Sequence, residues 1–187
     1  MESPENADEA KLIARSKKGN IEAFELLVKK YQKSIYYLCY RMTGTHQAAD
    51  DISQESFIKA YFSISQFKEG KKFFSWIRKI AVNACLNHLK TRKRETLLDE
   101  TILASGDNFS THQDMPLDKV QKDSLERKFR TSLETLSPEQ KSVFILKVFE
   151  GLSYEDISRI LTIPRGTVMS RLNRARAKLK NLLANYL

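Results

Sequence analysis

Two sets of side chains in this sequence of 187 residues have the types and the spacing to bind nucleic acid. The first recurs every three or four residues and combines an indole ring, two amides and several cations: Trp76, Lys79, Asn83, Asn87, Lys90 and Arg94. Rings stack on unpaired bases, amides bond exposed base edges and cations hold phosphates. The set therefore predicts contact with unpaired nucleic acid, although Trp76 taken alone is equally consistent with a packed core residue.

The second set lies near the end of the chain and falls on one face of a helix: Thr167, Ser170, Arg171, Arg174 and Lys178. Arginine can bond bidentately to guanine, and serine or asparagine can serve adjacent bases. Arg165 and Asn173 belong to the same segment and are further candidates. This pattern is typical of a recognition helix in the major groove of DNA. The alternative is a basic helix that only faces solvent.

A helix-turn-helix must position this second set, over residues 152–176. Its first helix would pack through Tyr154, Ile157, Ile160 and Leu161. Residues 162–164 break the pattern before a second helix begins near Arg165. That helix would bury a stripe at helical spacing: Val168, Leu172, Ala175 and Leu179.

The remaining chain also reads as helix, which predicts an all-α fold of two small helical domains. Helices are expected over 8–18, 21–42, 45–64, 73–94, 117–136 and 137–151. Residues 97–116 break the helical pattern and contain many turn-forming residues, which predicts a flexible linker. The domains are therefore 1–95 and 121–187, joined by an acidic linker over 96–120. The sequence has only 6 Gly and 4 Pro, too few for a β-sandwich with frequent turns.

The net charge of +9 is concentrated in two basic blocks, residues 68–94 and 157–187, with acidic residues between them. Two basic surfaces joined by an acidic spacer suggest two contacts on one long polyanion. Solvated helix faces would explain the charge equally well. The side-chain patterns above favour the polyanion.

One predicted helix has a different surface, which is acidic and polar with an apolar insertion: Asp50, Asp51, Gln54, Glu55 and Ile58. Such a face repels DNA. It would either face solvent or dock a protein partner that has a basic surface.

The sequence does not predict an active site, a cofactor site or a membrane-spanning segment. The acidic start is not a signal peptide, and no apolar run reaches the roughly 20 residues of a span. We therefore expect a cytoplasmic protein, with Cys39 and Cys85 as reduced packing residues. Cys85 and His88 are one helical turn apart, but no further ligand is nearby in the sequence, so we expect no metal site. No catalytic cluster is evident and no cofactor is implied.

Taken together, these segments resemble the extracytoplasmic-function group of bacterial RNA polymerase sigma factors. The resemblance rests on residues 49–61 and 74–83 in the first domain and on 136–140 and 163–171 in the second. Three positions depart from the family pattern. Asn87 stands where many relatives carry Asp, Ser158 stands where Ala is usual, and Thr162 replaces a Gly common in the turn.

The resemblance implies partners and roles. The acidic helix is similar to the surface that docks on the β′ clamp helices of core RNA polymerase, and the β subunit is a further contact. The loop over 66–72, including Lys72, and the helix after it resemble the region that melts promoter DNA and reads the minus-ten element. The helix-turn-helix resembles the reader of the minus-thirty-five element. Proteins of this group are commonly held inactive by an anti-sigma factor, often anchored in a membrane.

Two other classes remain as alternatives. A stand-alone helix-turn-helix regulator would explain the second domain but not the Trp76 face or the acidic helix. A nuclease would need a catalytic cluster that the sequence does not display. Tight binding to core polymerase distinguishes a sigma factor from both.

Overall fold

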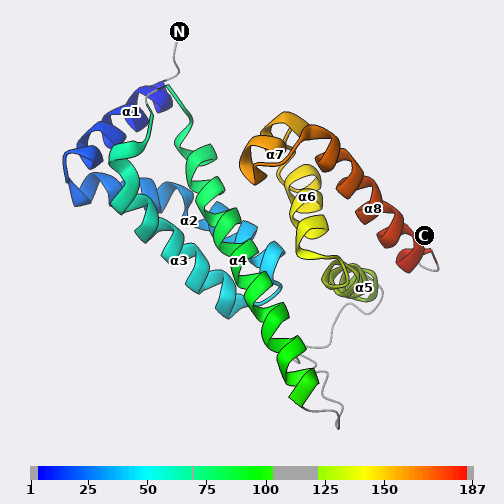
Figure 1. Cartoon of the computed structure of the whole chain (residues 1–187). Coiled ribbons are helices and arrows are strands. Elements are labelled where there is room, and N and C mark those ends of the chain that lie inside the picture. Colours follow the sequence, from blue (N-terminus) through cyan, green and yellow to red (C-terminus); the bar gives the residue numbers. More distant parts are fainter. Residues whose placement is uncertain (1–3, 69, 103–121, 185–187) are drawn as a thin grey trace. The chain divides into compact units, whose positions relative to one another are not determined.

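A computed structural model describes residues 4–68, 70–102 and 122–184 of the chain (Figure 1). Every regular element among these residues is helical, which confirms the all-α prediction. The elements are α1 (Pro4–Lys17), α2 (Ile21–Thr43), α3 (His46–Ser63), the short 3-10 helix η1 (Ile64–Gln66), α4 (Phe73–Ile102), α5 (Lys122–Glu134), α6 (Pro138–Val148), α7 (Tyr154–Leu161) and α8 (Arg165–Leu183).

Polar side chains fix the helix starts that the sequence indicates. The Asn20 side chain accepts a hydrogen bond from the Ala23 amide at 2.7 Å and caps α2. Thr45 caps α3 in the same way. Ser137 and Gln140 form a reciprocal capping box at the start of α6. Each cap satisfies amides that a helix start would otherwise leave unpaired.

The chain divides into two compact units. The first comprises Met1–Cys85 and Arg159–Thr162, and the second Leu86–Ser158 and Ile163–Leu187. In the first unit, α2 packs against α1 and α3, and α1 also contacts η1 (Figure 1). Its core includes Leu27, Ile35, Leu38, Phe73 and Ile77, which are fully buried.

Helix α4 is longer than the sequence pattern indicates, because it continues past Arg94 to Ile102. Residues 95–102 contain no glycine or proline, so nothing in them ends a helix. The expected linker over 96–120 therefore begins inside α4. Its remainder, from 103 onward, lies outside the described residues, as does the expected helix start at 117.

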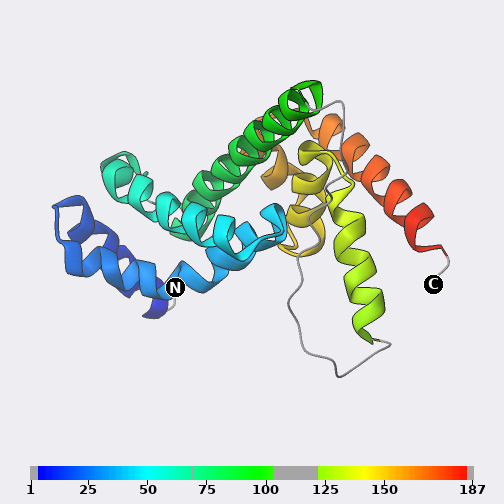
Figure 2. The same ribbon diagram turned by 90° about the horizontal axis from the view of Figure 1, so that it is seen from below.

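In the second unit, α8 packs against both α5 and α6 (Figure 2). The predicted stripe of α8 is buried as expected: Val168, Leu172, Ala175 and Leu179, with Leu183 continuing it. Ile157 of α7 is also buried. Across the described part of the chain, no helix is long and apolar enough to cross a membrane.

Candidate nucleic-acid interfaces and docking surface

The predicted face of α4 is open to solvent along most of its length. Trp76 is half-buried, and the polar members are exposed: Lys72, Lys79, Asn83, Asn87, Lys90 and Arg94. Lys72 immediately precedes the first residue of α4 and the others follow along it. A helix with one indole, amides and cations on one exposed side can stack bases and hold phosphates.

The surroundings of Trp76 are compatible with both interpretations of this residue. Its ring packs against Phe67, with centroids 5.3 Å apart, and against Phe73 at 5.6 Å. One part of the indole is therefore core, while its half-buried state leaves another part accessible. An indole held by two rings on its inner side is a rigid surface on which a base can stack.

The loop before α4 contains a residue that the sequence pattern missed. Phe67 is 4% exposed, although it lies in a stretch that reads as charged loop. Its ring also contacts Phe73, so it anchors the loop to the start of α4. A lone aromatic among polar residues is the signal that could have indicated this anchor. The cations Lys68, Lys71 and Lys72 remain exposed around it.

One cation of the first basic block is not on the surface. Arg78 is only 8% exposed, and its guanidinium lies 4.2 Å from the centroid of the Phe74 ring. Arginine stems pack well against apolar neighbours, and the guanidinium is attracted to a ring face. Arg78 is therefore a packing residue and does not belong to the nucleic-acid face.

The acidic face of α3 is exposed as predicted, at Asp50, Asp51, Gln54, Glu55 and Ile58. Phe62 is one helical turn beyond Ile58 and is 79% exposed, a residue that the sequence interpretation missed. An exposed phenylalanine beside an exposed isoleucine at 56% is unusual for a helix that only faces water. With Asp51 and Glu55, these two residues form a mixed acidic and apolar stripe, which we call the α3 stripe.

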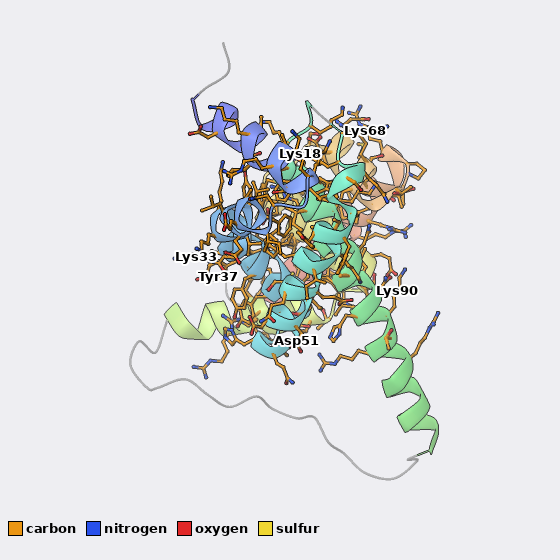
Figure 3. The ribbon with its side chains drawn as sticks, turned by 90° about the vertical axis from the view of Figure 1, so that its left-hand side faces the viewer. Lys18, Lys33, Tyr37, Asp51, Lys68 and Lys90 are labelled. Carbon is orange, nitrogen blue, oxygen red and sulfur yellow. The ribbon has the colours of Figure 1, made fainter. Side chains whose placement is uncertain are left out.

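The acidic end of the α3 stripe lies far from the loop before α4, whereas Phe62 at the other end of the stripe is close to that loop in sequence. Figure 3 shows Asp51 and Lys68 at opposite ends of the first unit. Helix α3 alone places Asp51 and Ser63 about 18 Å apart, at 1.5 Å per residue.

The face of α8 is exposed at Arg165, Ser170, Asn173, Arg174 and Lys178 and half-buried at Thr167 and Arg171. Lys178 donates a hydrogen bond to the Thr135 carbonyl at 2.5 Å, which attaches the middle of α8 to the end of α5. Met169 is 44% exposed beside Ser170 and was missed. An exposed methionine here is able to contact a thymine methyl group.

Two of the three departures from the family pattern meet at the turn between α7 and α8: Thr162 is in the turn, and Ser158 of α7 bonds to it. Thr162 has a φ of 54°, a left-handed conformation that favours glycine. The Ile163 amide bonds the Ser158 carbonyl at 3.1 Å, and the Ser158 hydroxyl donates to the Ile163 carbonyl at 2.6 Å. Ser158 thus holds closed the turn in which Thr162 is strained.

Replacing Thr162 with glycine should stabilise the fold by about 0.5–1 kcal/mol. Relief of the left-handed strain is worth about 1–2 kcal/mol, and the larger unfolded-state entropy of glycine offsets about half of that. The expected result is a higher urea midpoint with an unchanged slope, followed by far-UV circular dichroism. Thr131→Gly on α5 is the matched control and should destabilise, because Thr131 is inside a helix. A urea midpoint lower than that of wild type for Thr162→Gly would contradict the interpretation that Thr162 is strained.

Cys39 and Cys85 are both buried, as expected of packing residues. Within the residues that the structure describes, no group of three or more His, Cys, Asp or Glu side chains could hold a metal ion.

Comparisons with known proteins show which family the chain resembles. Residues 27–95 match the family model "Sigma-70 region 2", and residues 126–179 match "Sigma-70, region 4". The ECF RNA polymerase sigma-E factor of Haemophilus influenzae is 36% identical over 175 residues, covering 91% of this chain and 92% of that protein. The ECF RNA polymerase sigma factor SigW of Bacillus subtilis is 34% identical, covering 92% and 95%.

A solved structure has a similar fold. It is the sigma factor RpoE of Bartonella quintana, in complex with the anti-sigma factor NepR. The likeness has a TM-score of 0.64 and 25% identity and covers 86% of this chain and 96% of that one.

Proposed function

This chain belongs to the extracytoplasmic-function sigma factors of RNA polymerase, and on that premise we propose which of its surfaces perform each step of initiation. As a sigma factor of this type, it directs core RNA polymerase to specific promoters and assists DNA melting. The observation that carries this function is the presence of both region matches, in order, on one chain. A stand-alone DNA-binding regulator would need only the match to region 4. The family is one of initiation factors, and we propose that this chain performs no covalent chemistry of its own.

The α3 stripe is the proposed docking surface for the β′ subunit of core polymerase. Its acidic residues suit a basic partner and its apolar residues supply a contact that excludes water. Glu55 also forms an exposed ion pair with Lys59 at 2.6 Å, which contributes little by itself and can exchange for a partner cation. The proposed docking residues are Asp50, Asp51, Gln54, Glu55, Ile58 and Phe62.

The first unit and the face of α4 are proposed to open the promoter and read the minus-ten element. A base captured from the duplex loses its stacking, at a cost of a few kcal/mol that protein contacts must offset. The exposed cations of the loop and the rigid Trp76 surface supply contacts of that kind. The proposed residues are Lys72, Trp76, Lys79, Asn83, Asn87, Lys90 and Arg94.

The helix-turn-helix is proposed to read the minus-thirty-five element through α8. This assignment is supported by the exposed cationic face opposite a buried apolar stripe. The proposed residues are Arg165, Thr167, Ser170, Arg171, Asn173, Arg174 and Lys178. In this scheme residues 1–95 and 121–187 act on the two promoter elements and 96–120 connect them.

An anti-sigma factor is a further proposed partner, because the similar Bartonella quintana structure is a complex with one. The β subunit is proposed as a second contact with core polymerase. Val148 and Phe149 at the end of α6 are 48% and 40% exposed, and they are the apolar side chains proposed for this contact. We place the activity in the cytoplasm, where core polymerase is present.

The deciding experiment is transcription by purified core polymerase from a panel of promoters, with and without this chain. We expect defined start sites only when the chain is present. If core polymerase starts at the same positions in both reactions, this function is wrong. Heat-denatured chain serves as the control.

Arg174→Ala should weaken recognition of one promoter base pair by about 1–3 kcal/mol, because a bidentate arginine contact contributes that much discrimination. Holoenzyme affinities for the preferred sequence and for single-base variants would measure it. Affinity for core polymerase should not change. Arg176 is exposed on α8 outside the proposed base-reading set, and we expect it to contact a phosphate, so Arg176→Ala is the matched control and should weaken binding to all sequences alike. If Arg174→Ala behaves like this control, Arg174 reads no base.

A further inference from the structure

Glu9 on α1 makes a set of contacts that the acidic start of the sequence did not indicate. Its side chain is only 12% exposed, and it accepts a hydrogen bond from the Lys30 ammonium at 2.8 Å. It also accepts one from the Tyr31 hydroxyl and another from the backbone of Phe73. Lys30 and Tyr31 belong to α2, and Phe73 is the first residue of α4. One carboxylate therefore joins three helices.

The charge of Glu9 is favoured in this position. Burial raises the pKa of Glu9, but the hydrogen bonds from Lys30, Tyr31 and Phe73 and the charge of Lys30 outweigh it, so that the pKa lies below 4.5. Burial, together with the bond to Glu9, raises the pKa of Tyr31 to about 12. At neutral pH, Glu9 is thus ionised and Tyr31 keeps the proton that it donates. A carboxylate at the first residue of α4 also interacts favourably with the helix dipole.

The contacts continue from Glu9 to the loop before α4 through aromatic rings. The ring of Tyr31 stacks on Phe74 at 5.2 Å and lies 5.8 Å from Phe73. Phe73 in turn contacts Phe67 and Trp76. Helix α1 also packs on η1, at the other end of the same loop. Both ends of the loop are therefore fixed to elements that touch α1.

We propose that Glu9 is a positioning residue for single-strand capture: it fixes the first turn of α4, against which Phe67 packs, so that Lys72 and Trp76 can hold an unpaired promoter strand. This inference rests on the proposed function. It assigns a role to α1, which lies before the segment that matches the region 2 model. Glu9 itself does not touch the strand.

The test compares holoenzymes containing wild type, Glu9→Gln or Asp8→Asn. Asp8→Asn is the matched control, because it removes the same charge from the neighbouring residue, whose side chain is 79% exposed and pairs weakly with Lys11 at 3.9 Å. The probe is a promoter fork with an unpaired minus-ten strand. We expect Glu9→Gln to lower affinity for the fork about tenfold, because hydrogen bonds to a charged carboxylate are stronger than those to a neutral amide. Asp8→Asn should bind as wild type does.

Tyr31→Phe removes one of the donors to Glu9 and keeps the ring, so it should give a smaller loss on the same fork. All measurements are made well below the unfolding temperature of each variant. Affinity for core polymerase and for a duplex containing only the minus-thirty-five element should stay unchanged.

Three outcomes would overturn the inference. Glu9→Gln could unfold at lower temperature yet bind the fork as tightly as wild type, which makes Glu9 structural only. Glu9→Gln and Asp8→Asn could lose equal affinity, which makes the effect one of net charge. If wild-type holoenzyme does not bind the fork at all, the proposed function fails and takes this inference with it.

Discussion

Asp51→Arg is expected to lower the affinity of the chain for core RNA polymerase by about 100-fold or more. Asp51 is exposed on the α3 stripe, and arginine there would place a positive charge against a partner surface that we propose to be basic. Like charges facing each other in an interface cost several kcal/mol, and each 1.4 kcal/mol is tenfold in affinity. Competition between labelled wild-type chain and the variant for core polymerase would measure the change.

The matched control for this variant is Glu25→Arg. Glu25 is also an exposed acid, but it is on α2 rather than on the α3 stripe. It makes the same change in net charge, so its affinity should remain close to that of wild type. Unchanged affinity of Asp51→Arg, or equal losses in both variants, would contradict the docking assignment. A thermal midpoint close to wild type in both variants shows that the fold is intact.

Trp76→Ala is expected to reduce both stability and promoter opening. The half-buried indole packs on Phe67 and Phe73, so truncation should lower the free energy of unfolding by about 2 kcal/mol, less than for a fully buried tryptophan. Base stacking on an aromatic side chain contributes about 1–3 kcal/mol, so affinity for an unpaired minus-ten strand should fall at least about fivefold. Urea unfolding and binding to a fork template measure the two effects separately.

Trp76→Phe distinguishes stacking from packing. Phenylalanine retains a ring face, so the variant should recover most of the affinity for the unpaired strand while remaining less stable than wild type. If Trp76→Ala loses stability but binds the strand as tightly as wild type, Trp76 is a core residue only.

Local signals in the sequence were sufficient to predict most helix boundaries. Asn20, Thr45 and Ser137 act as caps through atoms within three residues of themselves, so their effect is readable from the sequence. The buried stripe of α8 follows from helical periodicity in the same way. The end of α4 is not predicted correctly. The composition changes after the predicted end of the helix, but residues 95–102 contain no glycine or proline that would stop it.

Features that depend on partners distant in sequence could not be predicted. Glu9 is 21 residues from Lys30 along the chain, and its spacing to Phe73 has no periodic signature. Arg78 reads as a surface cation until the Phe74 ring beneath its guanidinium is known. Phe62 reads as a core aromatic, and only the packing of α3 shows that its side chain faces outward. In each case burial is decided by tertiary packing rather than by local pattern.

The α3 stripe and the polar face of α4 share no side chain, which has a consequence for how such a protein diverges. Under the assignments proposed above, an inherited change at Asn83 or Asn87 would alter which DNA is favoured and leave attachment to the enzyme unchanged. A gene duplicate can therefore acquire a new set of target genes in small steps, each of which still assembles with the same polymerase.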